Sequence, residues 1–171
     1  MKRLFCLLII FFTLNLSAQT KTVADPAFFF DGKLVSQQTI AYIEPDLIAT
    51  VNVIKRDTVL NNVRFEGQLF IQSKNPKQFD FMTLEQIKNE YTKVKTKSVG
   101  YAINGEIIKD GIETLQLNRN YILEVITTNT TEFYNLGSGE IQSDIIHILG
   151  KTAKNIKDKR EQILRDAPKK E

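Results

Sequence analysis

Short apolar segments that alternate with polar residues and turn-forming pairs dominate the chain and predict β-strands. Residues 27–30 (AFFF) and 33–35 (KLV) flank the pair Asp31-Gly32. A tight primed turn needs positive φ at both central residues, which Asp tolerates and Gly adopts freely. We therefore expect a β-hairpin over residues 27–35.

The segments that follow predict a short helix and two more strands. Ser36 is a helix-capping residue, and the apolar spacing after it predicts a helical turn that ends before the break at residues 44–46. Residues 50–54 alternate with period two and are rich in β-branched side chains, which predicts a half-buried strand. Residues 57–62 are expected to be a connector, and residues 68–72 a further strand.

One helix is predicted from its capping residues and its apolar face. Thr83 and Gln86 have the spacing of a capping box, and apolar residues then recur at helical spacing. We place this helix from Thr83 to Lys95, with Lys88 among the residues of its solvated face.

The pattern before this helix returns after it. Residues 99–103 and 106–108 flank Asn104-Gly105, the second hairpin signal, 73 positions after the first. Strands are predicted at residues 121–128 and 145–149. The sequence thus predicts an α+β protein with two related β-β-α-β-β units, a connecting helix and a C-terminal helix.

The first 18 residues have the composition of a secretory signal peptide. Lys2-Arg3 precedes a short apolar run, and Ala18 is a small residue at the expected cleavage point. Removing 18 of the 171 residues leaves 153, with 21 basic and 20 acidic residues, so the charge is near +1. Cys6 leaves with the signal, so the exported chain is expected to hold no disulfide or Cys-ligated metal. The expected location is the periplasm or the outer membrane.

The C-terminal segment, residues 151–171, differs from the rest in charge. It holds 8 basic and 4 acidic residues and few apolar ones. A solvated or partly docked helix is one interpretation, and peripheral contact with an anionic lipid or acidic partner is the other.

Residues 25–74 carry a series of motifs in a recognisable order. An apolar strand ends in Asp31-Gly32, residues 43–55 read IEPDLIATVNVIK, and residues 65–74 read FEGQLFIQSK. This stretch resembles the plug domain of TonB-dependent outer-membrane receptors of the Bacteroidota type. Of the glycine-rich loop of that family, only Gly67 is kept.

The resemblance implies a plug-like fold but not a transporter. A receptor barrel of 22 strands needs more than about 200 residues, which the exported chain does not offer. The resemblance therefore implies a free-standing plug-like protein that binds other cell-envelope proteins. The expected division is residues 1–18 signal peptide, 19–78 first unit, 79–97 linker helix, 98–150 second unit and 151–171 basic tail.

Reactive clusters are not evident in the sequence. His147 is the single imidazole, and no nucleophile-elbow motif surrounds its neighbours Ser143 and Asp144. Residues 133–139 contain Gly137-Ser138-Gly139 but lack the ending of a phosphate-binding loop. We predict no catalytic residue, no metal, no cofactor and no nucleic-acid partner. A small hydrolase using Asp and Glu, or a small-ligand-binding module, remains an alternative.

The candidate binding residues lie in and beside the two turns. Phe29 must face away from Phe28 and Phe30 in a strand, so either the sheet is covered on both faces or Phe29 is at the surface. Free sheet edges are a second route to a partner, because an edge can accept a strand. The candidate binding residues are Phe29, Asp31, Gly32, Asn104 and Gly105. The oligomeric state stays open.

Overall fold

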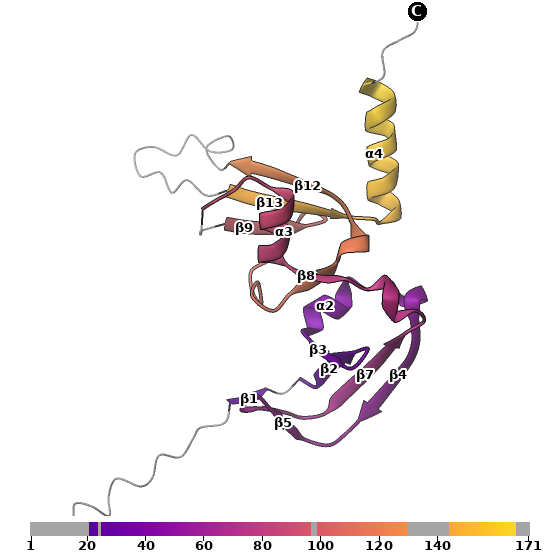
Figure 1. Ribbon diagram of the computed structural model, residues 1–171, viewed down its shortest axis with the longest axis vertical. Coiled ribbons are helices and arrows are strands. Elements are labelled where there is room, and N and C mark those ends of the chain that lie inside the picture. Colours follow the sequence, from indigo (N-terminus) through magenta and orange to yellow (C-terminus); the bar gives the residue numbers. More distant parts are fainter. Residues whose placement is uncertain (1–20, 24, 97–98, 130–143, 167–171) are drawn as a thin grey trace, which may run out of the picture.

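The computed structural model describes residues 21–23, 25–96, 99–129 and 144–166 (Figure 1). The predicted signal peptide, the loop at residues 133–139 and the last five residues of the tail lie outside this part. The strands are β1 (Lys21–Val23), β2 (Ala27–Phe30), β3 (Lys33–Val35), β4 (Ile48–Ile54), β5 (Thr58–Leu60), β6 (Val63–Phe65), β7 (Gln68–Ser73), β8 (Phe81–Thr83), β9 (Val99–Ile103), β10 (Glu106–Ile107), β11 (Gln116–Asn118), β12 (Ile122–Asn129) and β13 (Asp144–Gly150). The helices are α2 (Gln37–Ala41), α3 (Leu84–Tyr91) and α4 (Ala153–Asp166), with 3₁₀ turns at η1 (Pro45–Leu47), η2 (Pro76–Gln78) and η3 (Arg119–Tyr121).

The protein has the predicted α+β fold, built around two four-stranded sheets. The first sheet has the order β3-β2-β7-β4 and the second has the order β10-β9-β13-β12. In the first sheet, β2 pairs with β3 in a hairpin and runs parallel to β7, and β7 runs antiparallel to β4. In the second sheet, β9 pairs with β10 in a hairpin and runs parallel to β13, and β13 runs antiparallel to β12. Both far strands also shift register just after their first residue. That the two halves are copies of one unit stays a prediction.

Both predicted hairpins are confirmed, and their turns have the expected backbone. Asp31 and Gly32 have φ of 47° and 80°, and Asn104 and Gly105 have φ of 52° and 90°. Left-handed backbone is costly for most residues but not for Gly, Asn or Asp. The sequence pairs therefore specify these turns locally.

The connector predicted at residues 57–62 is wrong, because these residues belong to a third sheet. Strands β5 and β6 form an antiparallel hairpin, and β1 adds to β6 in parallel. The turn between them is Asn61-Asn62, with φ of 50° and 62°. Asn tolerates left-handed backbone, so this pair acts as Asp-Gly does elsewhere.

The predicted helix at residues 83–95 is shorter than expected, although its capping box is confirmed. Thr83 and Gln86 exchange the two expected hydrogen bonds, at 3.2 and 2.8 Å. The helix ends at Tyr91, because Thr92 has extended backbone with φ of −129° and ψ of 167°; its amide and hydroxyl still donate to the carbonyl of Lys88. The solvated position predicted for Lys88 is wrong: it is 5% exposed, and its ammonium group lies 2.8 Å from Glu85.

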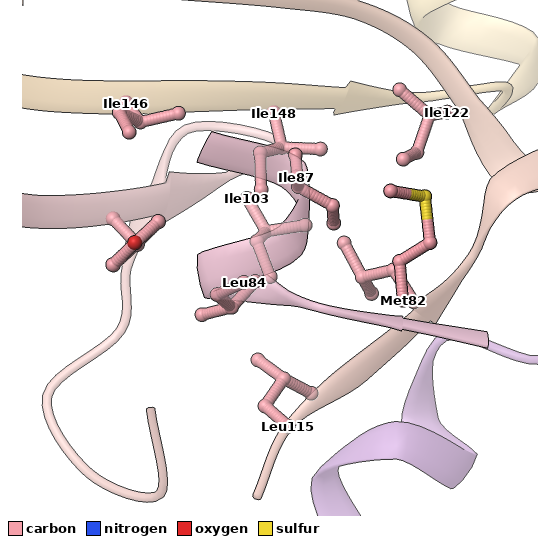
Figure 2. Close-up of a cluster of buried hydrophobic side chains, with 10 residues drawn as sticks. Met82, Leu84, Ile87, Ile103, Leu115, Ile122, Ile146 and Ile148 are labelled. Atoms are coloured by element: carbon pink, nitrogen blue, oxygen red, sulfur yellow. The ribbon is translucent and has the colours of Figure 1, made fainter. Parts of the chain in front are cut away.

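Two hydrophobic clusters form the core. The larger one joins the inner face of the second sheet to α3, and Figure 2 shows Leu84 and Ile87 beside Ile103 and Ile148. The smaller one lies under the first sheet around Phe30, and Phe81 packs against it. The members of the larger cluster are Met82, Leu84, Ile87, Tyr101, Ile103, Leu115, Leu117, Ile122, Ile146 and Ile148.

Strand β8 connects the two clusters. Consecutive strand residues point to opposite sides, so Phe81 packs on the first cluster while Met82 is buried in the second. The buried hydroxyl of Thr39 in α2 accepts a hydrogen bond from the amide of Gln116 at 2.9 Å. The two sheets are therefore held together by packing and by hydrogen bonds.

Candidate functional site: an open strand edge

Strand β4 is an edge of the first sheet and runs along the outside of the molecule (Figure 1). One side of its backbone pairs with β7 over residues 48–54. Within the described part of the chain, no strand pairs with the other side. Backbone groups alternate in direction along a strand, so about half of the N–H and C=O groups of β4 face this open side.

The side chains of β4 leave this edge unprotected. Its sequence, IATVNVI, contains no charged residue and no proline. Val51 and Val53 are each 54% exposed, although their register partners Ile71 and Leu69 belong to the first cluster or pack against it. Natural edges usually carry charges, proline or a covering element that prevents pairing with another chain. The strand predicted at residues 50–54 is confirmed, but its predicted half-burial is wrong, since every residue of β4 after Ile48 is exposed.

The corresponding edge of the second sheet, β12, is protected in the usual way. It carries Glu124, whose carboxylate lies 2.6 Å from the ammonium group of Lys159 in α4. Figure 1 shows α4 beside this end of the second sheet. The contrast singles out β4 as the unprotected edge of the pair.

The outer face of the first sheet adds aromatic surface next to β4. Phe29 stacks on Phe70 with ring centroids 4.7 Å apart and planes 6° apart. Strand register extends this row from Leu34 through Phe29 and Phe70 to Asn52 of β4. A shallow hollow of about 450 Å³ lies beside it, lined by β4 and β7 alone, at Thr50, Asn52, Ile54, Phe70 and Gln72. Phe29 is thus half-buried by a neighbour in its own sheet.

The predicted turn residues make bonds within their own sheets. The Asp31 carboxylate accepts hydrogen bonds from the amide and the hydroxyl of Ser73, at 2.8 and 2.6 Å. The Asn104 side chain accepts from the amide of Gly150 at 2.8 Å and donates to the Tyr121 hydroxyl at 2.7 Å.

Each turn is thereby tied to the end of the last strand of its sheet. Gly32 and Gly105 have open space where a Cβ would stand, so their positive φ, rather than close packing, explains glycine there. A binding role for Asp31, Gly32, Asn104 and Gly105 stays a prediction, while the geometry assigns Asp31 and Asn104 a structural role.

Two concave regions are relevant to the alternative functions. A groove of about 470 Å³ is lined by apolar side chains including Phe28 and Phe65 and by the carboxylates Asp25 and Glu113. A smaller hollow of about 210 Å³ lies between the halves, where Tyr42 and Tyr121 approach with ring centroids 6.1 Å apart. The pKa of Tyr42 is raised, first by burial and then by Tyr121 and Glu106.

Two further polar side chains have partners within the fold: Arg119 binds two carboxylates, and His147 shares a hydrogen bond with a hydroxyl group. The Arg119 guanidinium bonds to Asp80 at 2.7 Å and to both carboxylate oxygens of Glu90, and these contacts raise its pKa. His147 lies on the open face of β13 and shares a 2.7 Å hydrogen bond with the Thr128 hydroxyl.

Neither a metal site nor a membrane-spanning helix is found in the described ranges. No group of three or more His, Cys, Asp or Glu side chains within them is placed to hold a metal ion. No helix there is long and apolar enough to cross a bilayer.

Val51 and Val53 were not among the candidate residues chosen from the sequence, although sheet edges were. A sequence signal for an open edge was present, because residues 48–54 form a long uncharged segment without proline.

Searches against protein-family models, curated proteins and solved structures found no match to this chain. The resemblance of residues 25–74 to a receptor plug domain stays a prediction.

Proposed function

We propose that this chain is an exported, non-enzymatic protein that binds another protein of the cell envelope by accepting an extended segment at the β4 edge. The observation that carries the proposal is the uncharged edge strand β4, which pairs with β7 on one side and with no described strand on the other, and whose Val51 and Val53 are more than half exposed. The resemblance of residues 25–74 to a receptor plug domain supports a role in the cell envelope.

Strand addition supplies both affinity and selectivity at such an edge. Main-chain hydrogen bonds hold the added segment, and alternate side chains decide which segment fits. Val51 and Val53 offer apolar contact on one face, and the Phe29–Phe70 stack lies on the other. The segment that fits best is therefore extended, free of proline and apolar on alternate positions.

The test compares partner recovery by chains that differ at this edge. Val51→Lys places a charge on β4 without disturbing a buried side chain, so recovery of a specific partner from envelope extracts should fall at least tenfold. Val59→Lys is the matched control, because Val59 is 59% exposed and lies on β5 in another sheet. Equal recovery by both variants, or no specific partner for the unsubstituted chain, would refute the proposal.

The groove beside β3 favours a second candidate, a small-ligand-binding module. Its lining is mainly apolar and includes the acidic residues Asp25 and Glu113, which suits a small apolar molecule that carries a positive group. Glu113→Gln should weaken binding of such amines, measured by chemical-shift changes at Phe28 and Phe65. A groove that shows no shifts with any apolar amine would exclude this candidate.

A further inference from the structure

We infer that, when no envelope partner occupies it, the open edge of β4 pairs with β4 of a second copy, so that two chains pair edge to edge, antiparallel, about a two-fold axis at Val51. The inference rests on the proposed function in one respect, that the β4 edge accepts a strand. It goes further by naming the strand and its register.

The length and composition of β4 fit pairing with itself. Val51 is the central residue of the strand, so antiparallel overlap along the full length of β4 places Val51 opposite its own copy. The same register places Thr50 opposite Asn52, which joins two polar side chains on the outer face. On the inner face Val51 then meets Val51 of the other copy and Val53 lies opposite Ala49, so that both valines, now more than half exposed, become covered.

The charges that flank β4 select the antiparallel arrangement. Glu44 and Asp46 precede the strand, and Lys55 and Arg56 follow it. All four are exposed, and within the described residues none of them forms an ion pair.

Antiparallel pairing about Val51 brings Arg56 of one copy to Asp46 of the other, and symmetry repeats the contact. Parallel pairing would bring like charges together at both ends, which is unfavourable. An isologous contact of this kind closes after two copies, so it covers the open edge without building a fibre.

The first test measures the oligomeric state and the axis. Sedimentation should show a concentration-dependent dimer that Val51→Lys converts to monomer and Val59→Lys leaves intact. A residue on a two-fold axis faces its own copy, so Val51→Cys should give a disulfide-linked dimer under mild oxidation. The unsubstituted chain, whose one cysteine is Cys6, and Val59→Cys provide the background. Far-UV circular dichroism confirms that each variant is folded.

The second test reverses the flanking charges. Asp46→Lys or Arg56→Asp alone should raise the dimer dissociation constant about tenfold, because two symmetric surface pairs become repulsive. The double variant Asp46→Lys/Arg56→Asp should restore it, and Lys33→Glu on the opposite edge strand should have no effect.

The outcomes separate this inference from the proposed function. A chain that stays monomeric at every concentration, or a dimer indifferent to the charge reversals and to Val51→Lys, overturns the inference. If such a monomer still binds an envelope protein through β4, the proposed function stands alone. If neither a dimer nor a partner depends on β4, both fail.

Discussion

Gly150→Ala directly tests how the end of strand β13 packs against Tyr121 in the second sheet. Gly150 ends β13, and the ring of Tyr121 lies directly over it. A Cβ at this position would overlap both the ring carbons and the hydroxyl of Tyr121. The backbone amide of Lys151 also donates to the carbonyl of Tyr121 at 2.7 Å, so the two segments cannot separate without breaking this bond.

The expected cost has two parts. Forcing a methyl group into packed surroundings costs roughly 1–3 kcal/mol. Moving the ring also breaks the hydrogen bond between Asn104 and the Tyr121 hydroxyl, worth about 1 kcal/mol. The sum is about 2–4 kcal/mol, which for a chain of this size lowers Tm by about 4–16 °C.

Thermal and denaturant unfolding measure this cost, with Gly100→Ala as the matched control. Gly100 also lies in a strand, but a Cβ there would meet Ile145 at an ordinary 3.5 Å. In a Tyr121→Leu background the cost of Gly150→Ala should fall to that of the control, because the overlapping ring is gone. A Tm for Gly150→Ala equal to that of Gly100→Ala would refute the packing argument.

Three further predictions concern side chains whose partners the structure identifies. Asp31→Ala should lower the free energy of unfolding by about 2–4 kcal/mol, because two hydrogen bonds from Ser73 are lost and Ala disfavours the φ of 47°. Asp31→Asn should cost less, and equal denaturation midpoints for the two variants would contradict this. The hydrogen bond from Lys88 lowers the pKa of Glu85, so the stabilisation is present at neutral pH and lost as pH falls through that lowered pKa. Glu85→Gln should therefore lower Tm at pH 7 but not at about pH 2, and a pH-independent difference would contradict it. Burial raises the pKa of Tyr101 above 10.0, so stability should fall as pH rises above 10, and Tyr101→Phe should flatten that fall in denaturant titrations at increasing pH.

Local signals were sufficient wherever the conformation depends on neighbouring residues in the chain. The Asp31-Gly32 and Asn104-Gly105 turns follow from which residues tolerate positive φ, and the start of α3 follows from the Thr83–Gln86 capping box. The missed hairpin at β5 and β6 carried a local signal too, in Asn61-Asn62. These elements could be predicted from the sequence because the stability of each depends on short-range hydrogen bonds and backbone sterics.

The candidate site was less predictable, because edge position is not a local property. Alternation over residues 50–54 indicates a strand, but a central strand and an edge strand can share that pattern. Val51 and Val53 are exposed because β7 lies on one side of β4 and no described strand on the other. Likewise, helical spacing predicted a solvated Lys88, whereas the folded structure leaves it only 5% exposed.

The amino-acid sequence alone thus determined the α+β class, the two glycine-containing turns and the capped start of α3, since each depends on residues within a few positions of one another. Tertiary structure alone decided which strands became edges, that Phe29 would stack on Phe70, and that Phe81 and Met82 would enter different clusters. Those outcomes depend on segments far apart in the chain, whose contacts are selected by burial of the whole set of apolar faces together.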